Sequence, residues 1–392
     1  DLEALGLLKV DVLALGMLSA IRRSLQLIAG RRGRPFGMAD IPREVPAVYD
    51  MLCAADAMGV FQVESRAQMS MLPRLQPRRF YDLVVEVAIV RPGPIQGGMV
   101  HPYLAARDKI ARREAIAYPR PEIEPVLRRT HGVPIFQEQV MQLAMVAADF
   151  TPGEADQLRR AMAAWKRKGG LGPFYERLVG RMVEKGYARE YAERIFKQIE
   201  GFGEYGFPES HAVSFALLVY ISSWMKCYYP DIFAASLLNS QPMGFYQPAQ
   251  IISDAKKHGV VVKQVDVGYS HWDCTLEAKE GKYCVLRLGF RQVKGLKEED
   301  MQTLMALRDT TLLKDNTSGK QDVKHQGRET ELNIARFLDA GVSLSALEHL
   351  ADADAFRSIG LDRRKALWEI SALSDHLTGL FAGLPTDTSS EE

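Results

Sequence analysis

The sequence contains few cysteines, no long apolar segment and almost no net charge. None of its four cysteines forms a C-x-x-C pair, which excludes a zinc ribbon and a thiol-redox motif and favours a reduced, cytoplasmic setting. The longest apolar stretch, residues 212–225, is interrupted by three serines and therefore predicts a buried helix and no membrane contact. No segment is typical of a signal peptide. The net charge of +1 leaves nucleic-acid binding open, because Lys and Arg can cluster on one face.

The composition is that of a globular protein with several domains. Apolar residues make up 47% and charged residues 25% of the 392 positions, which allows sizeable cores in roughly two to four domains. Helical patterns dominate residues 46–250, whereas residues 259–288 alternate as strands do. The predicted fold class is therefore mainly α with a small β contribution. The clearest helices are expected at residues 153–168, 173–185, 188–201 and 211–228, and later ones at 330–340 and 344–351.

Two further segments differ in pattern from these helices. Residues 310–330 are polar and weakly periodic, which predicts a loop or disordered insert. The chain begins with Asp and enters a strand-like run at residues 5–12, so we expect it to be a fragment that lacks an N-terminal part. Thr151 and Pro152 are the expected N-cap and first residue of a helix.

Asp11 lies in the middle of the apolar run at residues 5–12. A carboxylate in that setting is costly unless it is paired or bound to a metal ion. A salt bridge to Lys9 is one interpretation, because residues two apart share one face of a strand. The other is a Mg²⁺ ligand at a strand end, with Lys9 contacting a phosphate.

A basic cluster follows within one predicted helix. It contains Arg159, Arg160, Lys166, Arg167 and Lys168. A solvated helix face is the ordinary interpretation of such a cluster. The interleaved Trp165 and the adjacent Gly-Gly pair favour contact with phosphates and bases instead.

Residues 205–211 (YGFPESH) read as a turn that enters a helix. Neighbouring Ser210 and His211 cannot act as a nucleophile and base, because adjacent side chains cannot fold onto each other. Ser210 is therefore expected to be an N-cap. His211 is expected in the first helical turn, near the positive end of the helix.

Residues 293–296 (VKGL) lie between a predicted strand and a predicted helix that runs to about residue 308. A helix-hairpin-helix turn of this kind offers backbone N–H groups to a phosphate. By itself the pattern is weak, since glycine turns are common.

Several longer motifs occur in order along the chain. They are LLKVDVLALGML, GVFQVESRAQM, VRPGPIQGGMV, FQEQVMQLA, ADQLRRAM and YGFPESHAVSFALLVY. Together they resemble the bacterial C-family DNA polymerases, the family of the polymerase III α subunit, over about residues 1–308 and 350–385. The segments FGEYGFPESHA, SSWMKCYYP and LLNSQPMGFY resemble the error-prone translesion members more than the replicative ones.

The resemblance implies a polymerase palm, in which three acidic residues hold two Mg²⁺ ions. Asp11 matches the third acidic residue, and Lys9 matches a lysine that contacts the incoming triphosphate. The first two acidic residues belong to a P-D-x-D strand, which this sequence does not contain. One carboxylate is too few for two ions, so the chain by itself is expected to be inactive.

The resemblance also implies binding roles outside the palm. Arg159 and Arg160 match finger arginines that grip the nucleotide phosphates. Gly206, Ser210 and His211 match positions close to the nucleotide, where His211 is expected to crowd a ribose 2′-hydroxyl. The DNA-binding positions are expected to be Lys166, Arg167, Lys168, Val293, Lys294, Gly295 and Leu296.

The implied organisation has four parts. Residues 1–45 end the palm, 46–250 form the fingers, 251–385 form a helix-hairpin-helix and clamp-binding domain with the insert at 310–330, and 386–392 are a disordered tail. Leu377, Leu380 and Phe381 lie where the family carries a sliding-clamp peptide, although the usual first Gln is His376 here. These apolar residues could equally pack on their own domain's helix at residues 367–373.

The expected parent activity is error-prone, template-directed DNA synthesis in translesion repair, in the cytoplasm and without membrane contact. The expected partners are primed template DNA, deoxynucleoside triphosphates, the sliding clamp and other translesion accessory proteins. Two alternatives remain: the replicative polymerase III α subunit, and a non-catalytic DNA-binding or clamp-tethered module.

Overall fold

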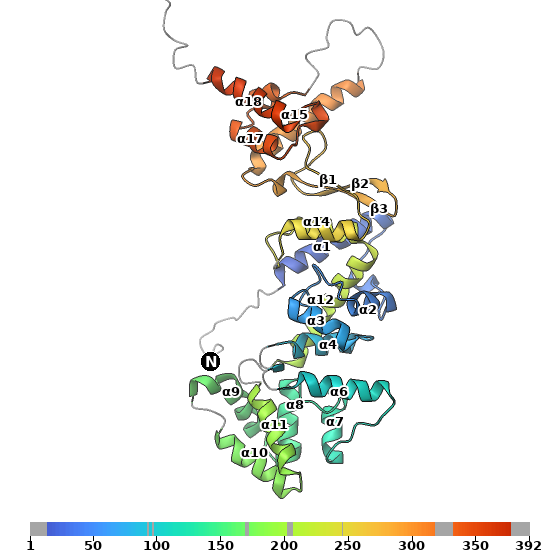
Figure 1. The fold of residues 1–392 in the computed structure, drawn as a ribbon, viewed down its shortest axis with the longest axis vertical. Helices are drawn as coiled ribbons and strands as arrows, with labels where there is room; N and C mark the ends of the chain where they lie inside the picture. Colours follow the sequence, from blue (N-terminus) through green and yellow to red (C-terminus); the bar gives the residue numbers. More distant parts are fainter. Residues whose placement is uncertain are drawn as a thin grey trace, which may run out of the picture. The chain divides into compact units, whose positions relative to one another are not determined.

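A computed structural model describes residues 14–91, 94–95, 98–168, 172–201, 207–244, 246–317 and 332–377, and of residues 163–168, 312–317 and 374–377 it describes the backbone alone. The chain divides into two compact units, Asp1–Tyr229 and Pro230–Glu392 (Figure 1). Helices dominate both units, and the second also contains a small sheet. The predicted fold class, mainly α with a small β contribution, is confirmed. No helix in the described part of the chain is long and apolar enough to cross a membrane.

The described part of the first unit is built from α-helices and short 3₁₀ turns. The α-helices are α1 (Leu15–Arg32), α2 (Pro46–Cys53), α3 (Arg66–Leu75), α4 (Phe80–Ile89), α6 (Val100–Ala111), α7 (Glu124–Leu127), α8 (Gln137–Ala148), α9 (Pro152–Lys168), α10 (Gly172–Glu184), α11 (Arg189–Gly201) and α12 (Glu209–Tyr228). The 3₁₀ turn η3 (Arg128–Thr130) follows α7 directly.

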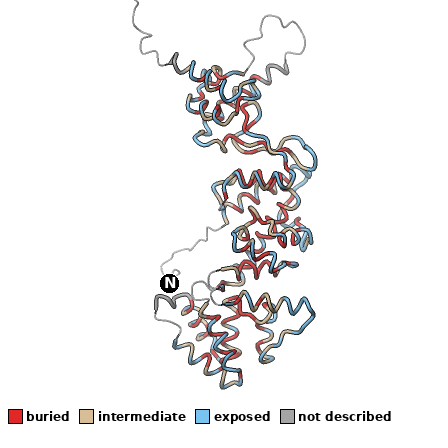
Figure 2. The backbone as a smooth tube through the Cα atoms, in the orientation of Figure 1, coloured by how far each residue is buried: buried red, intermediate tan, exposed pale blue. Residues whose placement is uncertain are grey.

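The centre of the first unit is the contact between α4 and α12. Residues 82–89 of α4 and residues 219–226 of α12 are all buried, as the red segments of Figure 2 show. Continuous burial explains how the apolar stretch at 212–225 is accommodated inside the protein, where Ser222 Oγ donates to Leu218 O at 2.6 Å and the neighbouring Lys226 is also satisfied. Lys226 donates to Met58 O at 3.0 Å and pairs with Asp56 at 2.8 Å.

Helix α4 buries two carboxyl groups whose pKa values are shifted in opposite directions by their surroundings. Burial alone raises the pKa of Asp82, but hydrogen bonds from Arg107 and from the backbone of Arg78 outweigh it and hold that pKa below its ordinary value. The carboxyl oxygens of Glu86 find no hydrogen-bond partner among the described residues, and burial raises the pKa of Glu86 to about 8. Glu86 is therefore protonated at neutral pH.

The predicted start of α9 is confirmed. Glu154 N donates to Thr151 Oγ1 at 3.4 Å, and Thr151 N donates to Glu154 Oε2 at 2.8 Å. This reciprocal pair is a capping box, with Pro152 as the first helical residue.

The predicted N-cap of α12 is wrong. The helix begins at Glu209, after an extended Pro208, so Ser210 is its second residue and His211 its third. The N–H of Glu209 donates to Glu138 Oε2 at 3.0 Å. A carboxylate from α8 thus takes the place that Ser210 was expected to fill. The placement of His211 in the first turn is confirmed.

The second unit joins a three-stranded sheet to a group of helices. Its elements are α13 (Pro230–Leu238), α14 (Pro248–Lys257), β1 (Val262–Lys263), β2 (Thr275–Glu280), β3 (Tyr283–Arg287), η5 (Phe290–Gln292), α15 (Glu298–Thr317), α16 (Ile334–Asp339), α17 (Leu344–Asp352), η6 (Arg357–Ile359) and α18 (Arg363–Leu377). The strand order is β1-β3-β2, with β1 parallel and β2 antiparallel to β3.

Helices α15 to α18 enclose a common apolar core. It contains Val267, Phe290, Met301, Leu304, Phe337, Leu347, Phe356 and Ile370. The two turns η5 and η6 each contribute a phenylalanine at or beside them, Phe290 and Phe356, and thereby anchor the loops that follow.

The expected loop at residues 310–330 is wrong for its first part, because α15 continues to Thr317. The threonines that weaken the sequence pattern are accommodated by side-chain bonds to the preceding turn. Thr310 Oγ1 donates to Ala306 O at 2.7 Å, and Thr311 Oγ1 donates to Leu307 O at 2.9 Å. Residues 318–331 lie outside the described part of the chain.

Candidate nucleotide and DNA interface

Arg159 and Arg160 share one carboxylate on α9. Arg159 donates to Asp156 Oδ1 through Nη2 at 2.7 Å and Nε at 2.9 Å, and Arg160 Nε lies 2.7 Å from Asp156 Oδ2. The hydrogen bond from Arg159 is the main reason that the pKa of Asp156 lies below its ordinary value. Two guanidinium groups are thus oriented by one acid and retain one excess positive charge. The sequence analysis did not identify Asp156, although its spacing of three and four residues marks it on a helix.

The start of α12 carries a cluster of rings. The ring of His211 lies 6.2 Å from that of Phe207 and 6.3 Å from that of Phe215, between centroids. The guanidinium of Arg91 lies 3.8 Å from the centroid of Phe207. Arg91 and Phe207 were not predicted as site residues, because nothing in the spacing of an arginine 116 positions upstream (207 − 91) indicates this contact.

Glu209 connects this helix start to the segment around η3. Its carboxylate accepts a hydrogen bond from Tyr81 Oη at 2.8 Å and pairs with Arg129 Nη2 at 3.0 Å. The first turn of α12 is therefore held from outside by α4 and η3.

The first hairpin, residues 293–297, is a tight turn between η5 and α15. Leu296 N donates to Val293 O at 3.5 Å, and Gly295 has φ +91°. A Cβ on Gly295 would lie 2.6 Å from His349 Nε2, so both conformation and space require glycine. Lys294 and Lys297 are exposed, but α15 then begins with Glu298, Glu299 and Asp300.

A second hairpin, residues 358–362, was missed by the sequence analysis. Its Gly360 also has a positive φ of +82°, and Leu361 N donates to Phe356 O at 3.2 Å. The next helix, α18, starts with Arg363, Arg364 and Lys365. The signal was present, because the Gly-Leu pair of the first hairpin recurs here and a basic triplet follows one residue later.

An exposed aromatic accompanies the second hairpin. Trp368 is 68% exposed, and the guanidinium of Arg364 lies 5.3 Å from its ring centroid. Asp362 caps α18 by accepting a hydrogen bond from Lys365 N at 2.9 Å. Exposed cations and an exposed indole beside a backbone turn can bind a phosphate backbone.

Several predicted positions lie outside the described residues. They are Lys9, Asp11, Gly206, Leu380 and Phe381, together with the side chains of Lys166, Arg167, Lys168 and Leu377. The clamp peptide was expected after the last helix, but α18 extends to Leu377 and includes His376. The roles of all the predicted site residues remain predictions.

Comparison with known proteins defines the class. Residues 17–186 match the bacterial DNA polymerase III alpha subunit finger domain, and residues 259–366 match a helix-hairpin-helix motif. These two matches confirm the resemblance to the bacterial DNA polymerase III α subunit family that the motifs predicted.

The curated relatives narrow the relationship further. An error-prone DNA polymerase of Alkalilimnicola ehrlichii is 57% identical over 385 residues, which are 98% of this chain and 35% of the relative. Error-prone DNA polymerases of Pseudomonas fluorescens (55% identity, 98% of this chain and 36% of the relative) and Sinorhizobium medicae (54%, 96% and 34%) are similar. The chain spans about a third of the length of these relatives.

Proposed function

We propose that this chain is the finger and helix-hairpin-helix part of an error-prone, template-directed DNA polymerase. The observation that carries the proposal is the 57% identity over 98% of the chain to a protein named error-prone DNA polymerase. The same similarity favours translesion and repair synthesis over the replicative α subunit. The non-catalytic module loses support, because the chain has a matching finger domain in addition to its DNA-binding motif.

The proposed cofactor is Mg²⁺, with Asp11 as the ligand that this chain contributes. Bound Mg²⁺ ions would activate the primer 3′-hydroxyl and neutralise the triphosphate. Asp11 lies outside the described residues, and one carboxylate supplies too few oxygens for two ions. We therefore expect no primer extension by this chain alone. Lys9 is proposed to contact the triphosphate.

The nucleotide is proposed to bind between α9 and the start of α12. Arg159 and Arg160, already oriented by Asp156, would exchange part of that pairing for phosphate oxygens. Gly206, Ser210 and His211 would border the sugar, with His211 excluding a 2′-hydroxyl. The rings of Phe207 and Phe215 lie beside the ring of His211.

Primed DNA is proposed to bind through the two hairpins and through Lys166, Arg167 and Lys168. The second hairpin is the better phosphate site, because Arg363, Arg364 and Lys365 follow it where acidic residues follow the first. The boundaries at residues 45, 250 and 385, the sliding clamp as a partner of Leu377, Leu380 and Phe381, further translesion accessory partners and a cytoplasmic location remain part of this proposal.

Primer extension by the longer polymerase that contains this chain tests the function. Asp11→Asn should abolish extension of a primed template and leave DNA affinity nearly unchanged, because the carboxylate is assigned to catalysis alone. Arg159→Ala should instead raise the KM for nucleotide about tenfold, the equivalent of ~1.4 kcal/mol. Normal extension by Asp11→Asn would contradict the assignment of the catalytic carboxylate.

A further inference from the structure

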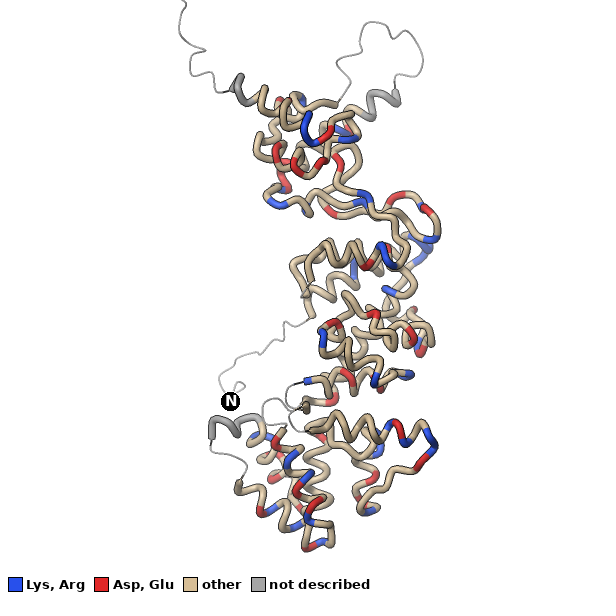
Figure 3. Tube along the Cα trace, in the orientation of Figure 1, with Lys and Arg blue, Asp and Glu red and all other residues tan. Residues whose placement is uncertain are grey.

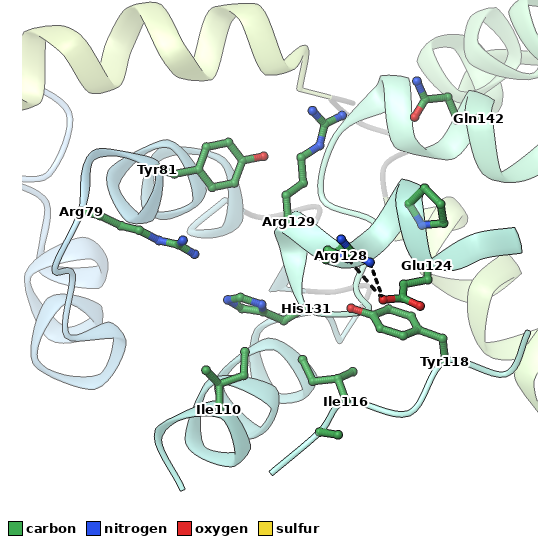
Figure 4. Close-up of a pocket in the computed structure, with 12 residues that line it drawn as sticks. Arg79, Tyr81, Ile110, Ile116, Tyr118, Glu124, Arg128, Arg129, His131 and Gln142 are labelled. Carbon is green, nitrogen blue, oxygen red and sulfur yellow. Dashed lines mark hydrogen bonds and ion pairs between the residues drawn. The ribbon is translucent and has the colours of Figure 1, made fainter. Parts of the chain in front are cut away.

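The first unit contains a basic cavity that none of the assignments above uses. A cavity of about 860 Å³ lies between the N-terminal end of α4, the segment after α6, and η3. In Figure 4, Arg79 and Tyr81 line one wall, while His131 and Arg129 lie opposite on the η3 segment, and Tyr118 lies beside Glu124 and Arg128. Its volume is in the range of sites for small organic ligands, roughly 300–1,000 Å³.

A second cavity adjoins the first. It has a volume of about 520 Å³ and shares Arg79, Ile110 and His131 with it. Together the two adjoining cavities form a groove that can hold more than one unit of a polymer. We call it the arginine groove, after the six arginines that line it: Arg74, Arg78, Arg79, Arg107, Arg128 and Arg129.

Within the described part of the chain, five of these six arginines pair with carboxylates, all except Arg74, and they retain further donors. Arg128 uses Nε and Nη2 for Glu124 Oε1, at 3.2 and 2.9 Å, and its side chain is still 74% exposed. Arg79 contacts Asp82 through Nε at 3.3 Å, while Arg107 lies closer to the same carboxylate, at 2.7 Å. A guanidinium has five N–H donors, so each of these groups can still bind an anion. Held side chains also lose less entropy when a ligand binds.

The charge balance in the groove is positive. Six guanidinium groups face five carboxylates that line the groove or pair with its arginines, namely Asp50, Asp82, Asp108, Glu124 and Glu209. His131 lines both cavities, and its pKa reflects its burial and the positive charge around it. Burial lowers the pKa of His131, and the cations Arg107 and Arg79 lower it further, against a weaker opposite effect of Asp82.

Aromatic and aliphatic side chains lie beside the guanidinium groups. Tyr118 is half-buried next to Arg128 and Glu124 (Figure 4). Ile110 is 43% exposed at the boundary of the two cavities. Arginines with an adjacent aromatic face are what a single strand requires, because its phosphates need cations and its unpaired bases stack on rings.

We propose that the arginine groove binds single-stranded DNA, with its phosphates on Arg79 and Arg128 and a base against Tyr118. This assignment rests on the proposed function only in taking the nucleic acid to be DNA. It adds a contact for unpaired template outside the nucleotide and hairpin sites. A free nucleotide carries the same phosphate chemistry. The presence of two adjoining cavities favours the strand.

The test measures binding of a fluorescent oligothymidylate of about 12 nucleotides to the whole chain by anisotropy. Arg79→Gln combined with Arg128→Gln should raise the Kd at least about tenfold. Loss of two phosphate contacts should reduce the slope of log K against log salt by about 1.4, since each single-strand contact contributes about 0.7. Both side chains are more than half exposed, so folding should be retained, and circular dichroism verifies this.

The matched control removes two arginines that are also more than half exposed from ion pairs elsewhere. Arg181 and Arg189 lie on α10 and α11, where acidic and basic residues alternate (Figure 3). Arg181→Gln combined with Arg189→Gln changes the net charge equally and should leave the Kd within about twofold of the unchanged chain. Equal weakening by both double variants would show that only net charge matters, and would overturn the groove.

Two further arms separate the ligand and the proposed function. Tyr118→Leu should weaken binding of the oligonucleotide severalfold without changing the weak binding of inorganic phosphate. Displacement of the labelled strand by an equal concentration of dTTP would overturn the strand as the ligand, in favour of a free nucleotide.

Duplex DNA with no unpaired template should bind the Arg79→Gln, Arg128→Gln variant with unchanged affinity. If the unchanged chain binds no DNA at low salt, the proposed function fails too; normal duplex binding with single-strand affinity unaffected by the groove variant overturns the groove alone.

Discussion

The two hairpins of the second unit have similar backbones, but the helices that follow them begin with opposite charges. Each turns on a glycine with positive φ, Gly295 at +91° and Gly360 at +82°, and each is followed by leucine. The first leads into Glu298, Glu299 and Asp300, and the second into Arg363, Arg364 and Lys365. A motif defined by backbone therefore does not reveal which copy contacts DNA. The residues that follow the turn decide its affinity for phosphate.

Both acidic and basic sequences are compatible with a helix start, for different reasons. Acidic residues in the first turn of α15 interact favourably with the helix dipole. The three cations at the start of α18 do not, so their position costs some helix stability. Asp362 offsets part of that cost as the cap of α18. Basic residues at a helix N-terminus, where the helix dipole disfavours them, are consistent with a role in binding an anion such as phosphate.

The largest expected difference between the hairpins is in their tolerance of a side chain. Gly295→Ala should destabilise the second unit by about 2–4 kcal/mol, because left-handed backbone costs ~1–2 kcal/mol and the new Cβ overlaps the fixed His349 ring. Gly360→Ala meets no atom within 4 Å, so it should cost only the backbone part, about 1–2 kcal/mol. Urea unfolding midpoints measure both, and equal losses would contradict the tight approach of His349 to the first hairpin.

The next largest effect concerns DNA. Changing Arg363, Arg364 and Lys365 together to Gln should raise the Kd for primed duplex about 30-fold at low salt, close to 2 kcal/mol. The salt slope should also fall by about 0.9 for each lost duplex phosphate contact. The corresponding change in the first hairpin, Lys294→Gln with Lys297→Gln, should raise the Kd only severalfold. The reverse order of effects would assign the DNA contact to the first hairpin.

The smallest expected effect is a dependence on pH confined to the second hairpin. The backbone N–H of Lys365 is the main cause that lowers the pKa of Asp362 below its ordinary value. A lowered folded-state pKa means that the cap stabilises above the unfolded pKa of about 3.9 and is lost as the pH falls through the folded pKa. Unfolding midpoints of the unchanged chain and of Asp362→Asn should therefore converge on acidification. A constant difference down to about pH 3 would show that the carboxylate charge plays no part.

The sequence was sufficient for elements whose signals are local. The start of α9 was predicted from Thr151 and Pro152, since a capping box involves neighbours only. Helices α9 to α12 were predicted nearly to their ends for the same reason. The longer extent of α15 was not, because the bonds of Thr310 and Thr311 to the preceding turn appear only once the helix exists.

The residues of the candidate sites divide in the same way. Arg159, Arg160 and the first hairpin could be predicted as candidates because their residues are adjacent in sequence. The cap that Glu138 provides to α12, the contact between Arg91 and Phe207, and the arginine groove join segments far apart in the chain. No spacing rule predicts which of 50 basic residues will converge on one cavity.

By itself the sequence determined the resemblance to the polymerase family, the mainly helical class and the positions of most helices, because these depend on long motifs and on periodicity within single segments. The tertiary structure alone decided which charged groups share a site. Asp82 and Glu86 lie on one helix, yet Arg107 keeps the first ionised and burial keeps the second protonated. The ionisation and binding capacity of a side chain are set by the groups around it in space, and the order of residues along the chain does not specify those neighbours.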